Sequence, residues 1–108
     1  MSLDVYLKCE CCGSVLFEAN ITHNLNKMAI QAGIYKHLWR PEEIGITKAK
    51  GLIEPLRAGL LLMIANPDHF DKFDDENGWG TYIQFMPWVQ KYLIACENNP
   101  EATVEVSR

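Results

Sequence analysis

The hydrophobic pattern of this chain changes period twice. Residues 4–10 and 15–21 alternate apolar and polar side chains, as half-buried strands do, and residues 102–106 alternate again near the other end. Between them, apolar side chains recur at the three- and four-residue spacing of helices that face a core. Alternation at both ends around helical segments predicts an α+β domain.

Three helices are predicted between the strands. The first starts after Thr22 and ends at Arg40-Pro41, because a residue before proline is disfavoured in the helical region. The second covers residues 48–65 and the third covers residues 81–98. The predicted fold is a small three-stranded antiparallel sheet, made of an N-terminal hairpin and a C-terminal strand, packed against three helices in the order ββαααβ. One domain spans residues 1–108.

The helix ends carry local signals. Thr22 and Thr47 are good N-caps, and Thr81 with Gln84 three positions later has the pattern of a capping box. Two further leucines widen the apolar stripe of the second helix, which we therefore expect to be the most buried. Residues 66–80 are rich in Asp, Asn, Gly and Pro and are expected to form a long, functional loop.

The charge excludes a general phosphate-binding surface. Ten Lys and Arg stand against fourteen Asp and Glu, for a net charge of −4, and no basic run of three residues occurs. Direct nucleic-acid binding is therefore not expected. The longest apolar run, residues 60–65, is too short to cross a membrane, which takes about 20 residues. The N-terminus lacks the pattern of a signal peptide, and we expect a cytoplasmic protein with reduced thiols.

Half of a zinc site is present near the N-terminus. Cys9 and Cys12 have the spacing of two zinc ligands, and Gly13 follows them. A structural zinc needs four ligands, and no second paired motif supplies the others. Zinc at Cys9 and Cys12, a zinc shared by two chains, and three reduced hairpin thiols all stay open. Cys96 lies on the apolar stripe of the last helix and is expected to be a small core residue.

Two polar clusters mark the ends of the first predicted helix. His23 and Asn24 lie in its first turn, where backbone N–H groups can hold an anion, although two polar residues can also simply cap a helix. Trp39, Arg40 and Glu43 place an aromatic ring, a cation and a carboxylate at its end. These three could contact a ligand, or an Arg–Glu ion pair could cover a half-buried tryptophan.

The segment before the last helix is the most unusual. Asn77-Gly78-Trp79-Gly80-Thr81-Tyr82 places two glycines around a tryptophan, which permits sharp backbone turns. Trp79 could plug the core, or this segment could form a ligand-facing wall with the N-terminus of the last helix and its free amides near Thr81. The acidic residues 68–76 could attract a basic partner or form a solvated face.

Several of these segments resemble a known family. In fixed order, they resemble segments of a family of small uncharacterised proteins encoded by bacteriophages and prophages. The segments are residues 19–25 (ANITHNL), 32–35 (AGIY), 38–43 (LWRPEE), 77–82 (NGWGTY), 92–96 and 104–108. The resemblance implies a phage origin and expression in a host cytoplasm. It brings no activity and no catalytic residue.

Three functions are consistent with these features. The first is a non-enzymatic protein that binds a small polar or nucleotide-like ligand, or a host protein. Its candidate ligand-binding residues are His23, Asn24, Trp39, Arg40, Glu43, Asn77, Trp79, Thr81 and Tyr82. The second is an inhibitor of a host defence or nucleic-acid enzyme that uses the acidic residues 68–76. The third is a small enzyme acting on a phosphorylated substrate, with His23 as acid or base and Arg40 holding negative charge. A homodimer through the hairpin edge and Ile83 or Trp88 is also open.

Overall fold

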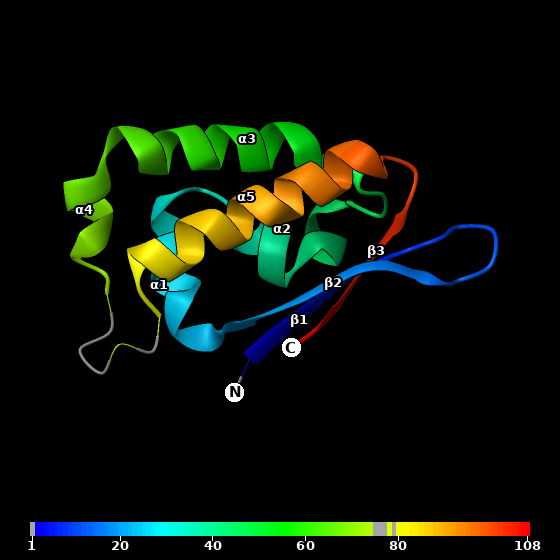
Figure 1. The fold of residues 1–108 in the computed structure, drawn as a ribbon, viewed down its shortest axis with the longest axis horizontal. Coiled ribbons are helices and arrows are strands. Elements are labelled where there is room, and N and C mark those ends of the chain that lie inside the picture. Colours follow the sequence, from blue (N-terminus) through cyan, green and yellow to red (C-terminus); the bar gives the residue numbers. More distant parts are fainter. Residues whose placement is uncertain (1, 75–77, 79) are drawn as a thin grey trace.

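One antiparallel sheet with helices on one face makes up the described residues 2–74, 78 and 80–108 of the computed structural model (Figure 1). Its order β2-β1-β3 joins β1 (Ser2–Lys8), β2 (Val15–Thr22) and β3 (Thr103–Ser107). The helices, with η marking a 3₁₀ helix, are η1 (His23–Leu25), α1 (Asn26–Gln31), α2 (Tyr35–Trp39), η2 (Pro41–Ile44), α3 (Lys50–Ala65), α4 (Pro67–Asp71) and α5 (Tyr82–Asn98). The α+β class and the sheet built from both ends are confirmed. The prediction of three helices is wrong, since the described residues form five α-helices.

The central strand β1 has one buried and one open face. Leu3, Val5 and Leu7 are fully buried, and the residues between them are partly exposed. Val5 lies opposite Ala19 of β2 and Val106 of β3, in antiparallel register. The alternation that identifies this strand therefore also decides which face of the sheet the helices cover.

The helices stack on the sheet through α5. Phe17 of β2 stacks on the ring of Tyr92 in α5, with centroids 5.8 Å apart. At the start of α5, the hydroxyl of Tyr82 donates a hydrogen bond to the carbonyl oxygen of Met63 in α3, at 2.9 Å. In Figure 1, α3 lies at the top of the molecule and the sheet at the bottom. No helix in the described ranges is long and apolar enough to cross a membrane.

The helix predicted from Thr22 to Arg40 is broken into η1, α1 and α2. Thr22 is an N-cap as predicted, since its Oγ1 accepts the N–H of Asn24 at 3.3 Å. α1 ends because Gly33 takes a left-handed conformation with φ +76°, after which Ile34 enters the core. The apolar spacing continues across this break, so the pattern alone predicts one helix.

α3 begins later than predicted because its first turn is bound to the residues before β3. Thr47 does not cap it: the N-cap is Ala49, which makes no side-chain capping bond. The N–H groups of Ala49 and Lys50 instead donate to the carbonyl oxygens of Ala102 and Pro100, each at 2.9 Å. Backbone carbonyls from the other end of the chain thus replace the capping side chain.

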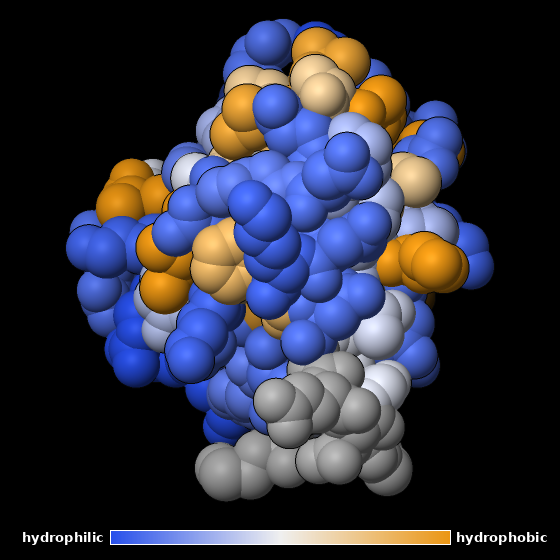
Figure 2. Space-filling model, turned by 90° about the vertical axis from the view of Figure 1, so that its left-hand side faces the viewer, coloured by the Kyte–Doolittle hydropathy of each residue, from blue (hydrophilic) through white to orange (hydrophobic). Residues whose placement is uncertain are grey.

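α3 is also more exposed than predicted. Leu61, Leu62 and Ile64 have exposed fractions of 61%, 44% and 53%. Seen from the α4 end, apolar surface gathers at the top of the molecule, where α3 lies (Figure 2). α3 packs on α5, whereas the sheet lies on the other side of the molecule (Figure 1), so part of α3 has no neighbour to cover it.

The loop predicted over residues 66–80 contains a helix. Pro67 occupies the first turn of α4, and the carbonyl oxygen of Asn66 accepts the N–H groups of His69 and Phe70 at 3.1 and 3.3 Å. Phe70 is 1% exposed. One buried aromatic side chain therefore anchors a segment whose composition is typical of a loop.

Gly59 lets α3 approach the link between α1 and α2. A Cβ at this position would lie 2.6 Å from Cγ2 of Ile34 and 3.2 Å from the carbonyl oxygen of Ala32. We predict that Gly59→Ala lowers the free energy of unfolding by about 1–3 kcal/mol through overpacking. This is opposite in sign to the gain of about 1 kcal/mol that alanine gives over glycine within a helix. Urea denaturation measures the change.

The Ile34→Ala variant supplies the control. Because it removes the clashing methyl group, the double variant should lose less stability than the sum of the two single variants. A Gly59→Ala protein as stable as the wild type would contradict this close packing.

Candidate functional site

The structure brings His23 against Trp39. The indole N–H of Trp39 donates to Nδ1 of His23 at 3.3 Å, and the two rings meet edge to face with centroids 6.1 Å apart. On its other side, Trp39 stacks on Tyr35 with centroids 5.5 Å apart. Trp39 is only 1% exposed. It is therefore a core residue that holds His23, and it does not itself offer a face to a ligand.

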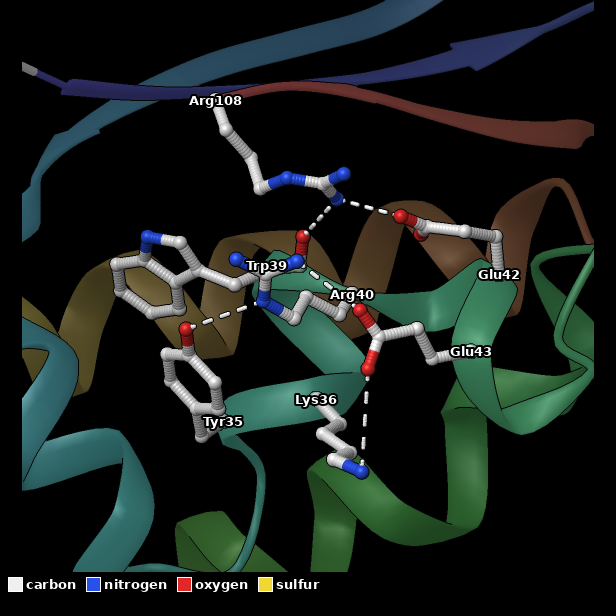
Figure 3. A network of polar contacts seen from close by, with 7 residues as sticks. All are labelled: Tyr35, Lys36, Trp39, Arg40, Glu42, Glu43 and Arg108. Atoms are coloured by element: carbon white, nitrogen blue, oxygen red, sulfur yellow. Dashed lines mark hydrogen bonds and ion pairs between the residues drawn. The ribbon is translucent and has the colours of Figure 1, made fainter.

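Arg40 is paired within the chain (Figure 3). Its Nε donates to the hydroxyl of Tyr35 at 3.4 Å, and its Nη1 donates to Oε2 of Glu43 at 2.9 Å. The hydrogen bonds to Tyr35 and Glu43 raise the pKa of the Arg40 guanidinium. Glu43 also lies 3.9 Å from Nζ of Lys36. Arg40 and Glu43 thus form the ion pair that the alternative interpretation describes.

Arg108, in the segment 104–108, also joins this network, although it is not among the candidate ligand-binding residues. Its Nη1 donates to the carbonyl oxygen of Trp39 at 2.7 Å and to Oε1 of Glu42 at 2.5 Å (Figure 3). The bond from Arg108 lowers the pKa of the Glu42 carboxyl. Because β3 pairs with β1, the last residue of the chain reaches the end of α2. Strand pairing, rather than any local motif, creates this contact.

The segment that begins α5 lies against η1. Gly80 is buried and has φ +117°, and a Cβ there would lie 3.1 Å from Cγ2 of Thr22 and 3.2 Å from Cβ of Asn24. Only glycine combines this backbone conformation with so close an approach. Residues 19–25 therefore lie against residues 77–82 at Gly80 and against residues 38–43 at Trp39. These segments meet at the end of the molecule where α5 begins (Figure 1).

The capping box at the start of α5 is confirmed, and it uses the amides expected to be free. Oγ1 of Thr81 accepts the N–H of Gln84 at 3.3 Å, and Oε1 of Gln84 accepts the N–H groups of Gly80 and Thr81, each at 3.1 Å. The next N–H, from Tyr82, donates to Oδ1 of Asp74 at 2.7 Å. Of the amides expected to be free near Thr81, those of Thr81, Tyr82 and Gln84 therefore already have acceptors within the chain.

Two candidate ligand-binding residues lie outside the described residues. These are Asn77 and Trp79, whose predicted roles stay predictions. Asn24 is exposed and follows the N-cap of η1, whereas Tyr82 is half-buried and its hydroxyl is bonded to α3. Tyr82 therefore connects helices, as a packing residue does.

His23 keeps one polar atom without a partner. The indole N–H can only donate, so Nδ1 of His23 accepts, and the neutral ring carries its proton on Nε2. This Nε2 is buried and has no hydrogen-bond partner among the described residues. The N–H at Nε2 is therefore a hydrogen-bond donor whose direction is fixed by the Trp39 bond, and it lies where residues 19–25, 38–43 and 77–82 come together.

A separate pocket lies on another side of Tyr35. Its volume is about 520 Å³, and Ile30, Gly33, Tyr35, Lys36, His37, Ile44 and Ile46 line it. The candidate ligand-binding residues do not line it. Burial lowers the pKa of His37 there, so this imidazole favours its neutral form.

Cys9 and Cys12 lie at the opposite end of the sheet from His23, in the β1–β2 loop (Figure 1). Within the described ranges, no three Cys, His, Asp or Glu side chains gather around one point. Zinc at Cys9 and Cys12 stays a prediction that needs ligands from elsewhere, such as a second chain. Cys96 is a buried core residue as predicted, and burial raises the pKa of its thiol to about 12.

The bond between Glu42 and Arg108 predicts a dependence of stability on pH. Because the pKa of Glu42 in the folded chain is below its ordinary value of 4.5, the bond stabilises the fold above that pH and is lost as the pH falls through the lowered pKa. Glu42→Gln should therefore have a lower Tm than the wild type at pH 7, and the two should converge in acid. Thermal unfolding between pH 7 and 2 measures the difference.

Glu54→Gln is the matched control. Glu54 pairs with Arg57 on the outside of α3 and is 82% exposed, so its replacement should leave the Tm almost unchanged. A gap between Glu42→Gln and the wild type that stays constant down to pH 2 would contradict the proposed ionic contact.

Most described candidate residues have partners within the chain. Trp39 donates to His23, and Arg40 donates to Tyr35 and Glu43. Among the described candidates, Nε2 of His23 is the buried polar atom that has no partner. No protein-family model, curated protein or solved structure matches this chain, so the site is interpreted from its own contacts.

Proposed function

We propose that this chain is a non-enzymatic binding protein that holds a small polar ligand where η1, the end of α2 and the start of α5 meet. The observation that carries the proposal is the buried Nε2 of His23, a donor without a partner among the described residues. A buried polar group left unpaired costs about 1–3 kcal/mol. An acceptor atom of a ligand at this position would remove that cost.

The contacts around His23 define what such a ligand must offer. Since Trp39 fixes the proton of the neutral imidazole on Nε2, the ligand atom there is an acceptor, such as a carbonyl oxygen, a phosphate oxygen or an unprotonated ring nitrogen. Nucleotides and their bases carry all three kinds of acceptor. This chemistry favours a small polar or nucleotide-like ligand.

The same contacts favour binding over catalysis. Nδ1 of His23 is occupied by Trp39, and Arg40 is paired with Glu43. The exposed thiols lie at the other end of the sheet, so no cysteine faces His23 as a nucleophile would face its base (Figure 1). A rigid, internally paired site suits recognition, because its geometry is fixed before the ligand arrives.

The proposed origin follows from the same segments. Residues 19–25, 38–43 and 77–82 are among the segments that resemble bacteriophage and prophage proteins, and described residues of these three segments lie close together. We therefore propose a phage or prophage protein that acts in the host cytoplasm.

We predict that His23→Asn weakens ligand binding about tenfold, as expected for one lost hydrogen bond of about 1.4 kcal/mol. The Asn side chain can keep an acceptor near the position of Nδ1 for the Trp39 indole, and it removes Nε2. The measurement has two steps. Native mass spectrometry of the protein purified from cytoplasm first detects a bound molecule, and thermal shift with nucleoside monophosphates then compares the wild type with the variant.

His69→Asn provides the matched control. His69 is exposed on α4, its Nε2 lies 3.4 Å from Oε1 of Gln31, and it is not among the candidate ligand-binding residues. This variant should bind like the wild type. Equal binding by His23→Asn and the wild type would reject the assigned site. A bare polypeptide mass together with no thermal shift from any nucleoside monophosphate would reject a nucleotide-like ligand.

A further inference from the structure

The loop between β1 and β2 holds three cysteines that the proposed function does not use. Two backbone hydrogen bonds close this loop: the N–H of Cys9 donates to the carbonyl oxygen of Ser14, and the N–H of Gly13 donates to that of Cys9, each at 2.8 Å. Gly13 has φ +76°, which permits the tight return of the chain. This closure places Cys9 and Cys12, three residues apart, within a single closed turn.

The loop is also anchored to the rest of the molecule. The carboxylate of Glu10 pairs with Nζ of Lys48 at 2.8 Å, and Lys48 pairs with Glu101 at 3.0 Å. Glu10, within the cysteine turn, is thus connected to Lys48 just before α3 and, through Lys48, to Glu101 just before β3. Cys11 and Cys12 are exposed and Cys9 is half-buried, so solutes can reach the turn.

The surroundings of Cys12 favour its thiolate. Its Sγ lies 3.0 Å from Oγ of Ser14. Hydrogen bonds from the side chain and backbone of Ser14, and from the Cys9 thiol, lower the pKa of the Cys12 thiol. The thiolate is the nucleophilic form of cysteine. Cys96 has the opposite environment, because burial raises the pKa of its thiol to about 12.

We propose that Cys9 and Cys12 form a thiol–disulfide exchange site that reduces an exposed, low-molecular-weight disulfide. Cys12 is the attacking residue, because it is exposed and its sulfur lies 3.0 Å from Oγ of Ser14. Cys9 is the resolving residue, because it lies three residues from Cys12 in the same closed turn. Ser14 is a positioning residue that acts through Cys12.

The exchange has two balanced steps. The Cys12 thiolate attacks one sulfur of the substrate, the substrate S–S bond breaks, and the other half leaves as a thiolate that takes up a proton. The Cys9 thiol then loses its proton and attacks Sγ of Cys12, the mixed disulfide breaks, and the second half leaves and is protonated. Two cysteine thiols are oxidised to one disulfide, and one substrate disulfide is reduced to two thiols.

The test uses the reduced full-length chain and glutathione disulfide without oxygen. The wild type should form one intramolecular disulfide between Cys9 and Cys12, identified by peptide mass mapping, and should release two glutathione thiols for each chain. Cys9→Ser should stop at one glutathione adduct on Cys12, and Cys12→Ser should lose the intramolecular disulfide. Cys11→Ser is the matched control, since it removes the neighbouring exposed thiol and should react like the wild type.

Ser14→Ala tests the role of the turn. In the Cys9→Ser background, where the adduct accumulates, Ser14→Ala should make the rate of adduct formation on Cys12 rise with pH later than in Cys9→Ser alone, and the two rates should converge above the ordinary thiol pKa of 9. Circular dichroism of each variant separates a chemical effect from loss of the fold. A disulfide that needs Cys11, or an equal rate for Cys12→Ser and the wild type, would overturn the proposal. So would a mixed disulfide on Cys12 that Cys9 never resolves.

Discussion

The buried indole of Trp39 ties together parts of the chain that are far apart in sequence. A buried tryptophan needs an acceptor for its N–H, and His23 at the end of β2 provides it. The carbonyl oxygen of the same residue accepts a hydrogen bond from Arg108 at the end of β3. Both outer strands of the sheet are thereby connected to the end of α2. The position of His23, and hence the donor it presents, depends on this one packing site.

Local signals predict the parts of the fold that local chemistry decides. The alternating residues of β1 and the capping box of Thr81 and Gln84 are found as predicted, because each depends on residues close together in the chain. Thr47 fails as a cap because carbonyl oxygens more than 50 residues further along bind the first turn of α3 instead. Gly33 breaks a helix whose apolar spacing continues on both sides. These differences come from tertiary contacts that no local pattern encodes.

In the candidate site too, local sequence predicts some features and tertiary contacts decide the others. His23, Trp39 and Arg40 were identified by residue type, and the structure brings His23 and Trp39 into contact. Their spacing could not show that Trp39 faces His23 rather than a ligand. It also could not show that Arg108 would join them, since that contact depends on the pairing of β3 with β1. Residue type thus located the region, and only the fold shows which atoms already have partners.

Three buried polar atoms lack partners among the described residues, and their surroundings separate them. Oη of Tyr92 lies on a fully buried ring between Phe17 and Trp88, where a ligand has no access, and burial raises its pKa so that the hydroxyl stays neutral. The second atom is Nδ1 of His37, which lines an apolar pocket. Burial lowers the pKa of this imidazole, so the ring favours its neutral form.

Nε2 of His23 differs from both. Its ring is oriented by a hydrogen bond on the opposite nitrogen, and a Cβ on Gly80 of the NGWGTY segment would lie 3.1 and 3.2 Å from the neighbouring Thr22 and Asn24. A polar atom that is buried in the core without a hydrogen-bond partner lowers the stability of the fold, and other interactions must compensate for it. This unpaired donor, held in one orientation where separate segments converge, is the reason that we propose a ligand whose acceptor atom completes it.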